Sequence, residues 1–338
     1  MIFLSIFTKL LQFLPGETSH LIALKGLKII HMLGLVNLFK FQENNFKNSY
    51  NLKKGKCQLK LKNRLGIAAG LDKNGDYIDC LSSLGIGFIE VGTVTPRPQK
   101  GNPKPRIFRD KKEKSLLNRL GFNNKGVDYL VKNLKNRKSE TIVGSSIGKN
   151  FYTPNYKAHE DYIYCLEKVY EFSDYIAVNI SSPNTKDLRK LSSEDFFDLL
   201  LKKLRDSHKK LSARFGYRPI FIKISPDETQ ENLKLICKSI VSNEMDGIIC
   251  SNTTVNHNDK NGSGGLSGAL LKKLSNENLT LVRDEVGEKF PIIASGGVMS
   301  VKDYQEKIEL GANLVQLYTG FIFEGPRLVK DIINLGAD

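Results

Sequence analysis

The segment FIEVGTV, residues 88–94, is one of eight short stretches that decide the fold of this chain. Each stretch is apolar or β-branched and ends in small or polar residues, a pattern typical of strands buried on both faces of a parallel sheet. The segments between them are long enough for crossover helices, and residues 196–215 and 300–310 have helical patterns. The other seven stretches are LGIAAG (65–70), TIVGSSIG (141–148), YIAVNISS (175–182), PIFIKIS (219–225), DGIICSN (246–252), PIIASGG (291–297) and LVQLYTG (314–320).

Eight strand–helix units predict an α/β fold, a (β/α)8 TIM barrel with a small N-terminal helical extension. A doubly wound open sheet is the alternative, but no GxGxxG motif opens a helix after the first strand. We divide the chain into an N-terminal amphipathic helical domain, residues 1–46, and a barrel domain, residues 47–338. In such a barrel the chemistry belongs at the carboxyl ends of the strands.

The composition excludes several classes of protein. With 40% hydrophobic and 9% aromatic residues, the 338-residue chain is not a disordered one. The five cysteines form no CxxC pair, which argues against a disulfide scaffold or a metal site and favours a reducing compartment. The net charge of +15 fits an anionic membrane surface, nucleic acid, an anionic ligand or simply a solvated lysine-rich surface. No nucleic-acid-binding motif is present, so we expect no nucleic-acid partner.

The first 40 residues favour a membrane-surface element over a membrane span. Large apolar residues recur at helical spacing from Phe3 to Leu14, the pair Pro15-Gly16 breaks the pattern, and a second periodic stretch covers residues 21–30. The longest late apolar run, residues 29–39, has 11 residues, whereas a spanning helix needs about 20. Two short amphipathic helices that lie on a membrane fit this pattern. Helices that only pack on the main domain fit it equally.

Polar residues cluster at the predicted strand ends. Gly296-Gly297 and Thr319-Gly320 follow the last two strands, where barrels commonly bind phosphate through backbone N–H groups, although a glycine pair also makes a tight turn. Lys223 lies within an apolar strand, where burial of its charge requires a salt bridge or a bound anion. The run 179–185, NISSPNT, suits recognition of a planar amide or imide, or a capped turn.

Ten motifs, in order from residue 65 to the end, resemble those of the dihydroorotate dehydrogenases, specifically the membrane-associated, quinone-dependent class. They are AAGLDKNG (68–75), VGTVTPRPQKGNPKPRIFR (91–109), NRLGFNN (118–124), IGKN (147–150), NISSPNT (179–185), KISPD (223–227), SNTT (251–254), GGLSG (264–268), ASGGV (294–298) and LVQLYTGFIFEGP (314–326).

The resemblance implies that one FMN binds at the top of the barrel and that (S)-dihydroorotate is oxidised to orotate in pyrimidine synthesis. A proton then leaves carbon 5, and a hydride passes from carbon 6 to the flavin. By the match to NISSPNT, Ser182 is the catalytic base. The soluble class has a cysteine in this role, so the serine favours the quinone class.

The resemblance also assigns binding residues. The residues that would hold the substrate are Lys73, Asn118, Arg119, Leu120, Gly121, Phe122, Asn179, Asn184, Asn252 and Thr253. The residues that would hold FMN are Ala69, Gly70, Lys73, Thr93, Ser146, Asn179, Lys223, Ser251, Gly268, Gly297, Tyr318 and Thr319. Two positions depart from the family pattern: Ser146 replaces the usual asparagine, and Glu324 replaces a basic residue.

A quinone acceptor implies an apolar tunnel to the flavin, and His20, Arg109 and Tyr318 match positions that line it. For His20, a surface histidine is the competing interpretation. We therefore expect a peripheral protein, with monomer favoured, on the cytoplasmic face of a bacterial inner membrane and in contact with anionic lipid. The rival functions are a soluble FMN barrel that uses fumarate or NAD, and a non-enzymatic basic barrel that binds membrane or nucleic acid.

Overall fold

The computed structural model describes residues 2–36, 49–185, 188–189 and 194–335. Eight parallel strands close into a barrel in which neighbours follow the order of the chain, so the predicted (β/α)8 fold is confirmed. The strands are β3 (Leu65–Ile67), β4 (Phe88–Val94), β7 (Ile142–Ile147), β8 (Tyr175–Asn179), β9 (Ile220–Lys223), β10 (Gly247–Cys250), β12 (Ile292–Ser295) and β13 (Leu314–Leu317).

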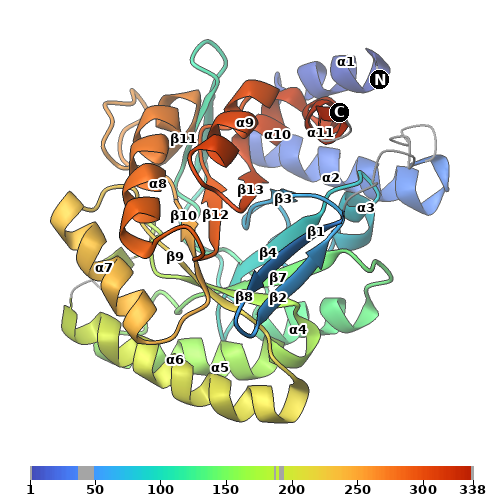
Figure 1. The fold of residues 1–338 in the computed structure, drawn as a ribbon. Helices are drawn as coiled ribbons and strands as arrows, with labels where there is room; N and C mark the ends of the chain where they lie inside the picture. Colours follow the sequence, from blue (N-terminus) through green and yellow to red (C-terminus); the bar gives the residue numbers. More distant parts are fainter. Residues whose placement is uncertain (1, 37–48, 186–187, 190–193, 336–338) are drawn as a thin grey trace.

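Helices surround the barrel (Figure 1). The predicted helices at 196–215 and 300–310 are present as α6 (Glu194–Phe215) and α9 (Val301–Glu309). Ser300 caps α9 because its hydroxyl accepts the N–H of Asp303. The remaining helices of the ring are α3 (Ile78–Ser82), α4 (Val127–Asn136), α5 (Ala158–Val169), α7 (Gln230–Ser242), α8 (Lys272–Val286), α10 (Thr319–Glu324) and α11 (Pro326–Leu335).

A hairpin packs against one end of the barrel core. It joins β1 (Tyr50–Lys54) to β2 (Cys57–Leu61), and its alternate residues Leu52 and Leu59 are paired and buried. They belong to the same apolar cluster as aromatic residues of the barrel interior, including Tyr175. This plugged end leaves the opposite, carboxyl end of the strands for a site.

A separate three-stranded antiparallel sheet is built from segments that follow β4 and β10. It consists of β5 (Ile107–Asp110), β6 (Ser115–Asn118) and β11 (Gly265–Gly268), with β6 in the middle. Asn118 pairs with Gly265, although 147 residues separate them in the chain. The sheet therefore brings two distant loops to the carboxyl end of the barrel.

The two predicted N-terminal helices are present as α1 (Ile2–Leu11) and α2 (Gly16–Met32), with Pro15 at the start of α2. They contact the barrel domain, α1 at α10 and α11 and α2 at α3 and β5 (Figure 1). Large apolar side chains of both helices nevertheless stay exposed, with 59% of Leu10 and 74% of Met32 accessible. One helical pair thus has both a packed face and an apolar solvent face.

The boundary predicted between residues 46 and 47 lies outside the described residues, so the division into domains stays a prediction. None of the helices in the described part of the chain combines the length and apolar character that a membrane span requires.

Candidate active site

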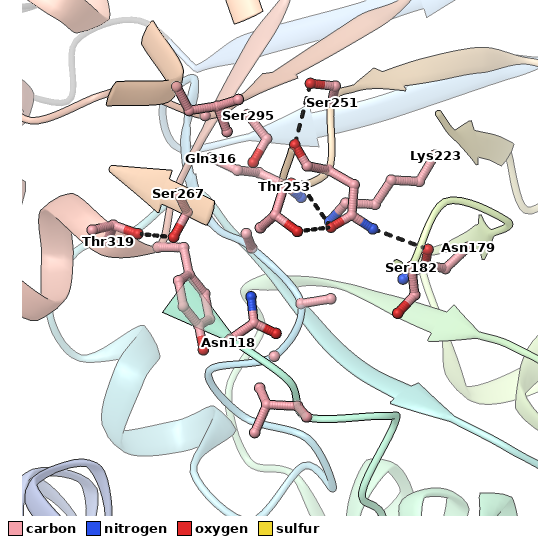
Figure 2. A pocket seen from close by; sticks show the side chains of 18 of the residues that line it. Asn118, Asn179, Ser182, Lys223, Ser251, Thr253, Ser267, Ser295, Gln316 and Thr319 are labelled. Atoms are coloured by element: carbon pink, nitrogen blue, oxygen red, sulfur yellow. Dashed lines mark hydrogen bonds between the residues drawn. The ribbon is translucent and has the colours of Figure 1, made fainter. Parts of the chain in front are cut away.

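A cavity of about 960 Å³, open to solvent, lies at the carboxyl end of the barrel (Figure 2). Nineteen of the predicted catalytic, substrate and cofactor residues line it, although they come from nine of the ten motifs spread along the chain. These residues are Ala69, Gly70, Lys73, Thr93, Asn118, Leu120, Gly121, Phe122, Asn179, Ser182, Asn184, Lys223, Ser251, Asn252, Thr253, Gly268, Gly297, Tyr318 and Thr319.

Two predicted residues are not among the described residues that line this cavity. Ser146 is fully buried one layer behind the wall, where its hydroxyl lies 2.9 Å from that of Thr93. The Arg119 guanidinium donates to the carbonyl of Ser263 and lies over the ring of Phe108. Arg119 directly follows Asn118, and side chains of neighbouring residues in extended backbone point to opposite faces. The structure therefore does not bring the Ser146 and Arg119 side chains to the cavity.

Four asparagines present amide groups to the cavity, and hydrogen bonds orient each of them. The Asn184 amide donates to Asn118 Oδ1 at 2.9 Å, and the Asn118 amide donates to the carbonyl of Gly265 at 3.0 Å. The Asn252 amide donates to Asn179 Oδ1 at 3.3 Å. Oriented amides offer both donors and acceptors, so the group suits a flat ligand with N–H and C=O edges.

Ser182 lies at the cavity beside this group and is 6% exposed. The one hydrogen bond found for its Oγ within the described residues comes from the N–H of Asn184, at 3.3 Å. Because that bond is accepted, the hydroxyl proton remains available toward the cavity or toward water. The position fits a group that exchanges a proton with a bound ligand.

Lys73 provides a cation at the same cavity. Its Nζ donates to the carbonyl of Gly70 at 2.8 Å. Burial, and next to it the charge of Arg106, lowers the pKa of Lys73 to about 8. The preceding Asp72 is buried and accepts the backbone N–H of Tyr77 at 2.8 Å, which fixes the turn that carries Lys73. Lys73 is therefore positioned to bind an anionic group.

A buried salt bridge lies at the floor of the cavity, and only one of its two residues, Lys223, was predicted from the sequence. Lys223 forms a salt bridge of 3.4 Å with Glu90, which is fully buried in β4. Gln316 and Tyr175 also donate to the Glu90 carboxylate, at 2.7 and 3.2 Å. The salt bridge, one of the two possibilities for Lys223, is therefore present, and the sequence signal for it was a glutamate within the apolar strand FIEVGTV, where burial of a charge requires a partner.

The far end of the cavity has the features of an anion cradle. Gly296 and Gly297 both have positive φ, +110° and +77°, and a Cβ on Gly297 would lie 2.4 Å from Cα of Lys272. Only glycine therefore fits this turn. Nearby, the hydroxyls of Thr319 and Ser267 lie 2.8 Å apart, and Figure 2 marks this hydrogen bond with a dashed line. Glu324 lies outside the cavity lining and forms an ion pair with Lys114.

A second, mainly apolar cavity lies between the N-terminal helices and the barrel; it is open to solvent, and its volume including that solvent is about 1600 Å³. It shares Asn118, Ser267 and Tyr318 with the first cavity. The three residues predicted for the tunnel, His20, Arg109 and Tyr318, all line it.

Hydrogen bonds across this cavity fix Arg109, one of the two basic residues. Arg109 donates to the carbonyl of Gln12 at 2.8 Å and to the hydroxyl of Ser19 at 3.2 Å, which ties β5 to α2. Burial, and next to it the charge of Lys73, lowers the pKa of His20 to about 3, so its imidazole is neutral at pH 7. His20 is half-buried and is not the free surface histidine of the competing interpretation.

Comparisons with known proteins identify the family of this chain. A family model described as dihydroorotate dehydrogenase matches residues 51–335. A protein of Coxiella burnetii named dihydroorotate dehydrogenase (quinone) is 45% identical over 95% of this chain and 93% of its own length. One of the same name from Buchnera aphidicola is 47% identical over 84% of this chain and 87% of its own.

The chain is also similar to a solved structure. The crystal structure of the Eimeria tenella dihydroorotate dehydrogenase in complex with ferulenol superposes with a TM-score of 0.82 at 32% identity, covering 91% of this chain and 89% of that one. The chain therefore belongs to the dihydroorotate dehydrogenase family, in the class whose curated members are named dihydroorotate dehydrogenase (quinone).

Proposed function

We propose that this protein oxidises (S)-dihydroorotate to orotate in de novo pyrimidine synthesis, with FMN as hydride acceptor and a membrane quinone as terminal acceptor. Family membership supports the reaction and the quinone. The observation that carries the proposal for this chain is the placement of Ser182, Lys73 and four oriented asparagines around one cavity. When bound, FMN would supply the site that accepts a hydride from carbon 6 of the substrate.

The substrate groups have matching partners. Lys73 would bind the carboxylate, because it is the cation at this part of the wall. Asn118, Asn179, Asn184 and Asn252, together with Thr253, would hold the planar ring by its amide edges. Holding both ends fixes carbon 5 relative to Ser182, which is how positioning lowers the barrier.

Ser182 would take the proton from carbon 5. A serine hydroxyl is a weak base at neutral pH, so it must pass its own proton onward as it receives another. The hydrogen bond from the N–H of Asn184 orients Oγ while leaving the hydroxyl hydrogen free for that transfer.

The lining fits FMN at both ends. Gln316 lines the cavity and donates to Glu90, and its buried Oε1 has no hydrogen-bond partner among the residues that the structure describes, so it remains an acceptor for an N–H of a ring. Lys223 would place positive charge beside the flavin ring, and Gly297 and Thr319 would hold the phosphate. Ala69, Gly70, Thr93, Ser251, Gly268 and Tyr318 complete the proposed contacts.

The second cavity is the proposed quinone path. It is apolar, it reaches Tyr318 at the first cavity, and α1 and α2 form its outer wall. The exposed apolar side chains of these helices would rest on an anionic membrane surface, with residues 1–46 acting as the membrane domain. We place the protein peripherally on the cytoplasmic face of a bacterial inner membrane, as a monomer.

Replacement of Ser182 tests the proposed chemistry. Ser182→Ala should retain FMN, because the flavin contacts are unchanged, and should lose at least about 100-fold in kcat, the usual contribution of a positioned base. Bound flavin is measured by absorbance and turnover by orotate formation. Wild-type turnover in Ser182→Ala would reject the serine as base. Purified protein that stays colourless after addition of FMN would favour the non-enzymatic alternative.

A further inference from the structure

We propose that Lys307 is a positioning residue for the cavity's phosphate end, its buried ammonium group lying behind the Gly296-Gly297 turn as the counter-charge of a bound phosphate. This inference rests on the FMN binding proposed above and adds a residue that does not line the cavity. Lys307 belongs to α9, on the outside of the barrel, yet it is 1% exposed.

A short chain of contacts connects Lys307 to the turn. Its Nζ lies 2.7 Å from Ser275 Oγ, in the first turn of α8. The Ser275 hydroxyl in turn donates to the carbonyl of Ser295 at 3.0 Å. A Cβ built on Gly296 would lie 3.0 Å from the same Ser275 Oγ. The ammonium group is therefore one hydroxyl away from the backbone that forms the cradle.

Lys307 has no carboxylate of its own among the described residues. Asp303 and Glu306, the acidic residues nearest on its helix, bind Lys272 at 2.5 and 2.7 Å. The hydrogen bond found for the Lys307 ammonium goes to a neutral hydroxyl. Burial lowers the pKa of Lys307 to about 8, while Cys250, Glu306 and Asp303 act to raise it and Lys272 to lower it.

A buried cation that has only a neutral partner is costly unless a further anion balances it. The position where that anion would lie is the glycine turn, because positive φ at both residues turns the backbone there into an open loop with no Cβ in the way. Of the two ends of a flavin nucleotide only the phosphate is anionic. Lys307 should therefore affect binding of the phosphate and not of the ring.

The test compares FMN with riboflavin, which lacks the phosphate. Full-length, flavin-depleted wild type and Lys307→Met are titrated with each ligand, and binding is followed by quenching of flavin fluorescence. We expect the Kd for FMN to rise at least tenfold in Lys307→Met while the Kd for riboflavin stays within twofold. Lys302→Met, which replaces an exposed lysine on the same helix, is the matched control and should change neither.

Each outcome is decisive. An unchanged Kd for FMN, or equal losses for FMN and riboflavin, would overturn the role of Lys307. Ser275→Ala keeps the charge and removes the connecting hydroxyl. Ser275→Ala should weaken binding of FMN and leave binding of riboflavin unchanged. If Lys307→Met does not fold, this variant tests the proposal in its place. Failure of the wild type to bind FMN would contradict the proposed function itself.

Discussion

We expect Glu90 to contribute more to the free energy of unfolding than any exposed carboxylate does, and the variant Glu90→Gln tests this. The variant keeps the shape of the side chain but removes the charge that faces Lys223 at 3.4 Å. At that separation and an effective dielectric constant of about 20, the attraction is about 5 kcal/mol. Loss of one partner of a buried pair typically costs about 3–5 kcal/mol, because the other charge stays buried without compensation.

The two estimates agree, so we expect Glu90→Gln to lower the free energy of unfolding by about 3–5 kcal/mol. Urea unfolding of flavin-depleted protein, followed by circular dichroism, measures this without a contribution from FMN binding. Glu309→Gln, at an exposed position of α9, is the matched control and should change stability by less than about 0.5 kcal/mol.

A double variant separates the ion pair from packing. Lys223→Met should also destabilise, but Glu90→Gln combined with Lys223→Met should cost much less than the sum, because neither charge is then left alone. A loss below about 1 kcal/mol for Glu90→Gln, or additive losses in the double variant, would refute the reasoning.

Two further predictions concern the cation and the helices. Because the pKa of Lys73 is lowered to about 8, its charge is lost above that pH. The affinity for orotate should therefore fall up to about tenfold per pH unit above about pH 8. In a fluorescence titration, Lys73→Met should bind orotate weakly, with an affinity that does not change with pH. Deletion of residues 1–40 should leave the rate of flavin reduction by dihydroorotate unchanged and lower the rate of quinone reduction, each measured as a stopped-flow half-reaction. Equal losses in the two rates would mean that the helices have only a structural role.

Local sequence patterns predict most of the fold. The eight barrel strands were predictable because each lies in a short, mainly apolar run, and each predicted run contains the observed strand. The sheet of β5, β6 and β11 was not, because its pairing depends on contacts between Asn118 and Gly265, which no local pattern encodes. The β1–β2 hairpin was missed as well, since lysines alternate with its buried leucines and mask them.

The site was predictable where a residue ends a strand and less so where side-chain direction matters. Asn179 and Lys223 reach the cavity as expected. Ser146 does not, because its short side chain is buried behind Thr93, and Arg119 does not, because its guanidinium points away to the carbonyl of Ser263. Glu90 and Gln316 were missed because their partners are distant in the chain.

Anaerobic mixing with dihydroorotate tests the central claim most directly. We predict that the yellow colour of bound flavin bleaches when dihydroorotate is added and returns when a quinone analogue follows, with one orotate formed per flavin. Flavin that stays oxidised under excess dihydroorotate, in protein shown to hold FMN, would contradict the claim.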